Sequence, residues 1–341
     1  MFDKPFGIER VECAGAPRDL GRAQGEAFKH AIRDHVARSG AALRRRRSPV
    51  LTAWSSGPVL GAGAGREIIR HYPHLSERMA GLALGADLPL DSLMASLVQP
   101  APSSSAFLNA PAVVLASEEL GEGGVFAARS LGTPSTPCAR WVLRRSRPEV
   151  GFASVELTLP WLVSAVAGVN SEGVTAVMAR SDVVGSRGAP PILLVQECLQ
   201  RFASIDGCLD WCLKREAFGR ALLFVADVEG GVAAIEFEGS ERRVIRPSDG
   251  CLIEGVSSAA AAELRKARER HPDPPFDAGS LDWVALAASD GAEGEPRGRD
   301  LAGSMSVHLE SAARRLSLHR VNAKGAGQFD EPPEPVELVA S

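Results

Sequence analysis

After Pro102 the sequence changes from helical periodicity to short β-branched runs, and this change constrains the fold more than any other feature. The segments PAVVLAS, GVFAARS, ARWVLRRS, VGFASVELTL, LVSAVAGVN and VTAVMARSD are short, rich in β-branched residues and punctuated by Gly, Pro or Asn-Ser-Glu-Gly. Such runs are typical of strands, and turns rather than helices join them, so they predict an antiparallel sheet. Residues 221–246 add a predicted hairpin with Glu-Gly-Gly at its tip, and residues 250–257, 304–311 and 315–322 add three further strands.

Helical periodicity precedes and interrupts these strands. Apolar residues recur at helical spacing in 17–38, 65–86 and 88–98, so the first hundred residues are predicted to be mainly α. Gly21 and Gly25, four residues apart, would let another backbone approach closely. The Arg-, Pro- and Gly-rich segment 41–65 is predicted to be a loop or a loosely helical excursion. Further helices are predicted as a pair within 192–216 and singly at 259–270 and 281–289.

This order of elements predicts an α+β fold made of two antiparallel sheets. Each sheet would bury one face on the other and one face under helices, which gives a four-layer α/β/β/α sandwich. A pair of separate α+β domains is the competing layout. The expected organisation is a helical N-terminal segment at 1–101, a core at 102–328, and a mobile, acidic, proline-bearing tail at 329–341.

Composition excludes several classes of function. A net charge of −4 gives no concentrated basic face for nucleic acid, and no apolar run approaches the ~20 residues of a membrane span. The six cysteines are scattered without the paired spacing of metal ligands. We therefore expect a soluble cytoplasmic protein with no metal, no cofactor, and neither nucleic-acid nor membrane partners; the oligomeric state stays open.

Several motifs together resemble a known family. Five stretches resemble, in order and spacing, the isopenicillin-N acyltransferase-like autoproteolytic cysteine peptidases and acyltransferases. They are the opening GAPRDLGRAQGEAFKHAI, the hairpin GEGGVFAARSLG, the turn AVAGVNSEGVTAV, the helix pair at 190–214 and the hairpin LLFVADVEGGVAAIEFE. The resemblance implies the fold of the N-terminal-nucleophile hydrolases. It also implies chemistry on amide or thioester acyl groups, with 1–101 corresponding to a propeptide-like segment that this chain retains.

The expected nucleophile position carries no reactive group. An N-terminal-nucleophile enzyme needs a Cys, Ser or Thr at the start of a strand, freed by self-cleavage so that its own amine acts as the base. In the family that cysteine precedes the hairpin arginine by about twenty residues, and counting back from Arg129 leads to Ala110. The family aspartate corresponds to Gly132, and a late-strand asparagine corresponds to Gly255. Arg129 and Asn170 are the polar site positions that remain.

Two functions follow from this pattern. The first is a catalytically degenerate member, a pseudoenzyme that binds a small acyl or peptide-like ligand, or a protein partner, around Arg129 and Asn170. The second is an active amidohydrolase or acyltransferase with a serine nucleophile, Ser103, if the loop after PSSSAFLN is longer than the family spacing. The segment after Ser103 forms a poor strand and the segment after Ala110 a good one, which favours the first.

Other polar residues have simpler interpretations. Asp227 is predicted to set the turn of its hairpin, and His71 and His74 are predicted to lie on a helix surface. His308 and His319 lie on the last two predicted strands, where they could face each other across the ladder.

Overall fold

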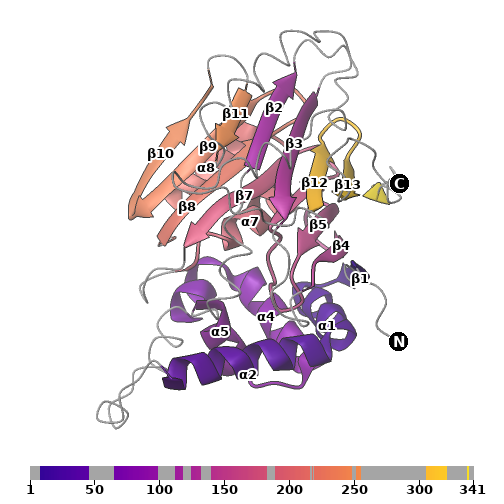
Figure 1. Ribbon diagram of the computed structural model, residues 1–341, viewed down its shortest axis with the longest axis vertical. Helices are drawn as coiled ribbons and strands as arrows, with labels where there is room; N and C mark the ends of the chain where they lie inside the picture. Colours follow the sequence, from indigo (N-terminus) through magenta and orange to yellow (C-terminus); the bar gives the residue numbers. More distant parts are fainter. Residues whose placement is uncertain are drawn as a thin grey trace, which may run out of the picture.

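The computed structural model describes residues 8–45, 65–98, 112–117, 124–131, 140–182, 189–215, 217, 219–247, 251–254, 305–320 and 336–337. Within these residues the chain has a mixed α+β fold in which a large sheet, a second sheet and helices pack together (Figure 1). The α+β class predicted from the sequence is confirmed.

The larger sheet, sheet A, has eight strands in the order β1-β4-β5-β6-β7-β8-β9-β10. Each strand from β5 to β10 pairs antiparallel with the strand that precedes it in the chain, as the turn-rich sequence predicts. The edge strand β1 is absent from the sequence-based prediction and lies parallel to β4. The strands of sheet A are β1 (Glu9–Gly15), β4 (Val142–Pro148), β5 (Ser154–Thr158), β6 (Ala167–Asn170), β7 (Thr175–Asp182), β8 (Gly219–Ala226), β9 (Val232–Gly239) and β10 (Glu241–Ile245).

The second sheet, sheet B, has the order β11-β2-β3-β12-β13-β14, and all its neighbouring strands are antiparallel. Its last strand falls in the tail that we predicted to be mobile, and pairs there with β13. The strands of sheet B are β2 (Ala112–Ser117), β3 (Gly124–Leu131), β11 (Cys251–Glu254), β12 (Met305–Glu310), β13 (Arg315–Arg320) and β14 (Val336–Glu337).

Four labelled helices of the N-terminal segment lie together beside sheet A: α1 (Pro17–Ala27), α2 (Lys29–Arg45), α4 (Pro73–Ala86) and α5 (Leu90–Val98) (Figure 1). The single helix predicted for 17–38 is wrong in its bounds. Phe28 leaves the helical backbone region, with φ −117° and ψ 23°, and its side chain is buried. The chain therefore turns at Phe28, and α2 extends to Arg45, into the segment predicted to be a loop or a loosely helical excursion.

Glycines allow α1 and α4 to cross in close contact. A Cβ atom added to Gly25 of α1 would lie 2.5 Å from the Leu82 carbonyl oxygen of α4. Cβ atoms on Gly21, Gly81 and Gly85 would meet the partner helix's backbone more closely still. The close backbone approach predicted from Gly21 and Gly25 is confirmed.

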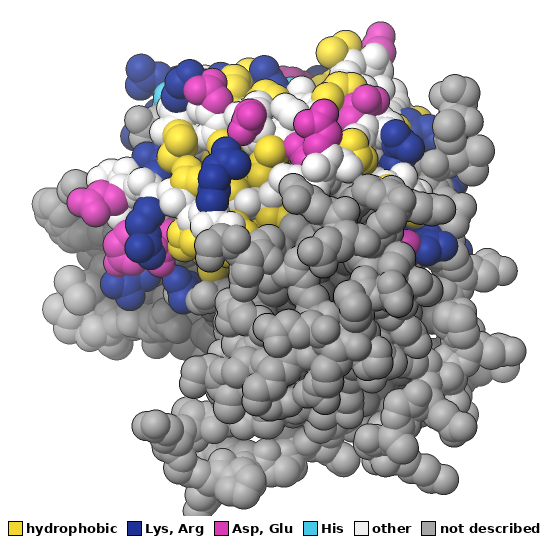
Figure 2. Space-filling model, turned by 90° about the horizontal axis from the view of Figure 1, so that it is seen from above, with side chains coloured by type: hydrophobic (Ala, Val, Ile, Leu, Met, Phe, Trp, Pro, Cys, Tyr) yellow, Lys and Arg dark blue, Asp and Glu magenta, His cyan; other side chains and the backbone are white. Residues whose placement is uncertain are grey.

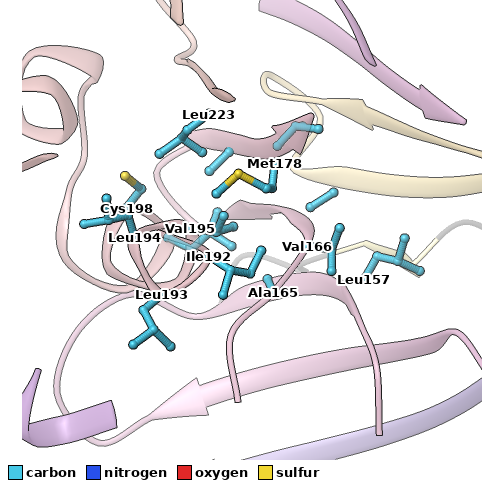
Figure 3. Close-up of a cluster of buried hydrophobic side chains, with 14 of the residues drawn as sticks. Leu157, Ala165, Val166, Met178, Ile192, Leu193, Leu194, Val195, Cys198 and Leu223 are labelled. Carbon is cyan, nitrogen blue, oxygen red and sulfur yellow. The ribbon is translucent and has the colours of Figure 1, made fainter. Parts of the chain in front are cut away.

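Helices α7 (Leu193–Arg201) and α8 (Ile205–Lys214) cover sheet A on the face opposite to sheet B (Figure 1). The Ser204 hydroxyl caps α8 by accepting a hydrogen bond from the Gly207 amide at 3.5 Å. Apolar side chains of α7 pack on those of the sheet in a continuous core (Figure 3). This contact includes Leu157, Ala165, Val166, Met178, Ile192, Leu193, Leu194, Val195, Cys198 and Leu223.

Sheet B packs on the remaining face of sheet A through β2, β3, β11, β12 and β13. The described residues thus form a helix layer, sheet A and sheet B. The helices predicted at 259–270 and 281–289 lie outside the described residues.

Candidate functional site

The four residues Ser103, Ala110, Gly132 and Gly255 lie outside the described residues, but the strands beside them are described. Strand β2 begins at Ala112, two residues after Ala110, and β11 ends at Glu254, immediately before Gly255. Arg129 lies on β3, where its backbone is described.

The strand register brings these distant sequence positions together. Ala112 pairs with Arg129 on one side and with Glu254 on the other, so three chain segments meet in one cross-strand row of sheet B. We call this the Ala112 row. Paired positions of neighbouring antiparallel strands lie about 5 Å apart. The start of β2, the Arg129 position of β3 and the end of β11 therefore belong to one end of sheet B.

Asn170 is buried, and its side-chain amide is fully engaged with the backbone. Its Nδ2 donates to the carbonyl oxygens of Leu199 at 2.9 Å and Phe202 at 2.8 Å. Its Oδ1 accepts from the amides of Glu172 at 3.0 Å and Val174 at 2.9 Å. An amide can donate two hydrogen bonds and accept two, so this set fills its capacity. Asn170 fixes the β6–β7 turn and ties it to the end of α7.

The structure does not bring Asn170 to the Ala112 row. A Cβ on Gly173, in the same turn, would lie 2.8 Å from the Ser311 carbonyl oxygen, and the Ser311 amide donates to the Val125 carbonyl at 3.1 Å. Val125 precedes Arg129 by four residues on β3, which is about 13 Å of strand. The Asn170 turn therefore lies beside the opposite end of sheet B.

Two other sequence predictions have clear outcomes. Asp227 sets its hairpin turn, as predicted, because its Oδ1 accepts from the amides of Glu229 at 3.2 Å and Gly231 at 3.1 Å. The direct pairing of His308 with His319 is wrong, because the register places His308 opposite Ser317 and His319 opposite Ser306. The β12–β13 turn fixes this register, with Glu310 opposite Arg315.

His71 and His74 are less exposed than the predicted helix surface implies. The His71 side chain is 18% exposed and its Nε2 lies 3.2 Å from Glu67 Oε2. The His74 Nε2 lies 2.8 Å from Oε1 of Glu197, a residue in the middle of α7 whose side chain is fully buried. Both histidines therefore pair with carboxylates.

A buried polar cluster around Arg144 was missed by the sequence analysis. Arg144 of β4 donates from Nε to Glu156 Oε2 of β5 at 2.5 Å, and both side chains are fully buried. Its Nη1 donates to Gln24 Oε1 of α1 at 2.6 Å, and its Nη2 donates to Gln196 Oε1 of α7 at 2.9 Å. We call this the Arg144 cluster; its members are Gln24, Arg78, Arg144, Ser146, Ser154, Glu156 and Gln196.

Further hydrogen bonds hold the Glu156 carboxylate. Oε1 accepts from Ser154 Oγ at 2.6 Å and from Gln196 Nε2 at 2.7 Å, and Oε2 accepts from Ser146 Oγ at 3.1 Å. Burial raises the pKa of Glu156, but the Arg144 and Arg78 guanidinium groups and these hydrogen bonds lower it more, so the net pKa is below the ordinary value. Glu156 is therefore ionised at neutral pH.

The Arg144 cluster joins the N-terminal segment to sheet A. Gln24 also donates from Nε2 to the carbonyl oxygens of Leu159, Pro160 and Leu162, at 3.2, 2.9 and 3.0 Å. Because the cluster is sealed from solvent, it is suited to holding structure together and not to binding a substrate. In ARWVLRRS and SVELT, Arg144 and Ser146, and likewise Ser154 and Glu156, are two residues apart, which could have indicated that each pair lies on one face of its strand. Only the fold shows that this face of the sheet is buried.

A shallow hollow of about 220 Å³ lies on β1, β4 and β5 of sheet A. Its wall includes Arg10, Glu12, Leu143, Arg145 and Val155. These strands belong to sheet A, whereas the Ala112 row lies in sheet B.

The described parts of the chain also bear on metal sites and membrane spans. There, no group of three or more His, Cys, Asp or Glu side chains is arranged to hold a metal ion, and no helix has the length and hydrophobicity to cross a membrane. Figure 2 shows one face of the molecule, on which basic and acidic side chains are interspersed among hydrophobic ones over the described part.

Comparisons with known proteins found similar solved structures at low identity. Penicillin V acylase from Agrobacterium tumefaciens is 13% identical, with 62% of this chain and 83% of that chain covered and a TM-score of 0.40. The Caenorhabditis elegans ortholog of N-acylethanolamine-hydrolyzing acid amidase is 13% identical, with 59% and 93% covered and a TM-score of 0.41. A mutant of conjugated bile acid hydrolase from Clostridium perfringens is 11% identical, with 67% and 92% covered and a TM-score of 0.42. No protein-family model and no curated protein matches the sequence. These similarities are too low to assign this chain to a family or an activity.

Proposed function

We propose that this chain is a degenerate N-terminal-nucleophile hydrolase, related to the isopenicillin-N acyltransferase-like proteins, that binds a small acyl or peptide-like ligand without cleaving itself. The observation that carries the proposal is the Ala112 row. Strand β2 starts just after Ala110 and pairs with Arg129 at its first residue. This pairing supports a placement of the expected nucleophile position and its hairpin arginine at one sheet end, and the residue at the nucleophile position is alanine.

The chemistry of Ala110 explains why self-cleavage is not expected. A methyl group can neither attack a carbonyl nor hold an acyl group, and removing the nucleophile from a cooperating set abolishes most of the catalysis. Gly132 and Gly255 also lack the side-chain heteroatoms of their family counterparts. The absence of the family's cysteine, aspartate and asparagine side chains together indicates a protein that no longer performs the family reaction.

In this proposal the fold is completed as a four-layer sandwich. Residues 259–270 and 281–289 supply helices over the outer face of sheet B, whose inner face packs on sheet A. Strand β2 (AVVLAS) is apolar at consecutive positions and therefore on both faces, and a sheet with two apolar faces must bury both, which supports such a cover. Arg129 is the proposed ligand-binding residue, because its planar guanidinium group can hold a carboxylate through two parallel hydrogen bonds.

Intact-mass spectrometry of the purified chain under denaturing conditions tests the proposal. Denaturing conditions are essential, because β1 and the Arg144 cluster would keep a cleaved N-terminal segment bound to the core in native buffer. We expect one polypeptide of 35.9 kDa. Cleavage before Ser103 that a Ser103→Ala variant abolishes would refute the proposal and support the serine-nucleophile enzyme.

Ligand binding is tested separately by calorimetry with N-octanoylglycine, which combines an acyl chain with a carboxylate. Arg129→Met is expected to weaken binding at least about tenfold, because it removes a bidentate charged contact. Arg147→Met is the matched control, since Arg147 is an exposed arginine in sheet A, on strand β4. Equal affinity in the two variants would contradict the assigned role of Arg129.

A further inference from the structure

Arg78 is a buried cation whose guanidinium group is only partly satisfied. It extends from α4 towards β4, where its Nη2 donates to Ser146 Oγ at 3.0 Å. The residue is 1% exposed, and its Nε and Nη1 have no hydrogen-bond partner among the described residues. Buried donors of this kind are rare in native proteins, and a bound water or ion usually accounts for them.

The charges around Arg78 do not balance. The charged or titratable groups that act on it are Arg144, Glu156 and the Cys13 thiol. Glu156 already pairs with Arg144 at 2.5 Å and is ionised, so the one carboxylate serves two guanidinium groups. Burial raises the pKa of Cys13, which keeps the thiol neutral at physiological pH. The enclosed group therefore carries one net positive charge.

Deprotonation does not remove this charge. Burial and the neighbouring Arg144 lower the pKa of Arg78 to about 10, which still leaves the group protonated at neutral pH. Water could satisfy the free N–H groups but could not neutralise the charge, and an uncompensated buried charge is strongly unfavourable.

The position of Arg78 is also fixed. The tight crossing of α1 and α4 brings the Arg78 backbone against Gly21, so the helix cannot slide to expose the side chain. The near-complete burial of Arg78 excludes a large ligand with an exposed portion. The compensating group must be small and enclosed.

We propose that Arg78 holds one small monovalent anion of the halide class against its Nε and Nη1 hydrogens, at the junction of the N-terminal helices with sheet A. The ion balances the second guanidinium group of the Arg144 cluster. It thereby stabilises the attachment of residues 8–98 to the core. This site is independent of the ligand proposed for the Ala112 row.

Bromide serves as the probe in two experiments on the full-length chain. In thermal unfolding, sodium bromide is titrated against sodium gluconate at constant ionic strength. The melting temperature is expected to rise by roughly 5 °C at a hundredfold excess over the dissociation constant. Arg78→Met, which keeps an unbranched apolar stem but removes the guanidinium group and its charge, should abolish this response. Arg147→Met, on the exposed part of β4, should retain it.

Crystals of the wild-type chain grown in bromide provide the second readout, which does not depend on the folding of any variant. An anomalous peak within hydrogen-bond distance of Arg78 Nε or Nη1 would support the proposal. Water density at that position without an anomalous signal would overturn it. A bromide response of equal size in Arg78→Met and wild type would overturn it as well.

Discussion

Replacing Gly25 with alanine tests whether the α1–α4 crossing is as tight as the structure indicates. On helix propensity alone the substitution should stabilise the protein by about 1 kcal/mol. The structure predicts the opposite sign. The new Cβ would lie 2.5 Å from the Leu82 carbonyl oxygen and 2.9 Å from the Gly85 Cα, whereas ordinary contacts begin at 3.4 Å.

The magnitude follows from what must move. Both neighbours are backbone atoms, so no side-chain rotation relieves the clash, and the helices must separate locally by about 0.9 Å. Overpacking of this kind costs about 1–3 kcal/mol, and the rigid neighbours place it near the upper limit. After subtraction of the propensity gain, we expect a net loss of about 2 kcal/mol. Gly21→Ala should cost more, because its added Cβ would come closer to the Arg78 carbonyl oxygen.

Urea unfolding followed by circular dichroism measures this loss through the midpoint and slope. Leu84→Ala is the control, since Leu84 lies on the exposed side of α4 and its truncation should change stability by less than about 0.5 kcal/mol. Unchanged or increased stability of Gly25→Ala would refute the close crossing.

Two further predictions concern buried polar groups. Asn170→Ala should destabilise the chain by about 2–4 kcal/mol in urea unfolding, because it leaves buried backbone groups of Val174 and Leu199 without partners. The control, Glu172→Ala at the exposed turn position, should change stability by less than about 0.5 kcal/mol. Equal effects of the two substitutions would contradict the structural role of Asn170. His35 stacks on Trp161 with ring centroids 3.8 Å apart, and burial lowers its pKa from 6.5 to about 3. The unfolded chain therefore binds a proton that the folded chain does not, so His35 should reduce stability as pH falls below 6.5 by up to about 1.4 kcal/mol per pH unit. His35→Phe should remove this contribution between pH 6.5 and 4, and identical pH profiles for wild type and variant would show that His35 is not buried as described.

Local patterns predicted much of the fold. Short β-branched runs and turn residues identified the strands of sheet A from β4 to β9, and the Gly21 and Gly25 spacing predicted the helix crossing. These features are encoded within short segments. The edge strand β1 was missed, because its parallel pairing with β4 depends on a chain segment more than a hundred residues away.

Buried charges could not be predicted in the same way. Arg144 and Glu156 in isolation resemble residues on the solvated side of a strand. Their burial requires Gln24 and Gln196, which come from helices on either side of them in the sequence. The same holds for Asn170, whose turn chemistry was evident but whose bonds to Leu199 and Phe202 depend on how α7 docks. For the site, the register pairs Ala112 with Arg129, and the placement of Ala110 beside them stays a prediction.

Covalent trapping tests the central claim most directly, namely that the chain carries no activated nucleophile where β2 begins. The folded chain would be treated with a fluorophosphonate, which reacts with activated serine, and with iodoacetamide, which reacts with thiolates, and the adducts would be located by peptide mapping. We predict no adduct in residues 102–117 and no labelling of any side chain that is stronger in the folded chain than in the heat-denatured chain. A stoichiometric adduct on Ser103, or on another single side chain, that disappears on denaturation would contradict the account.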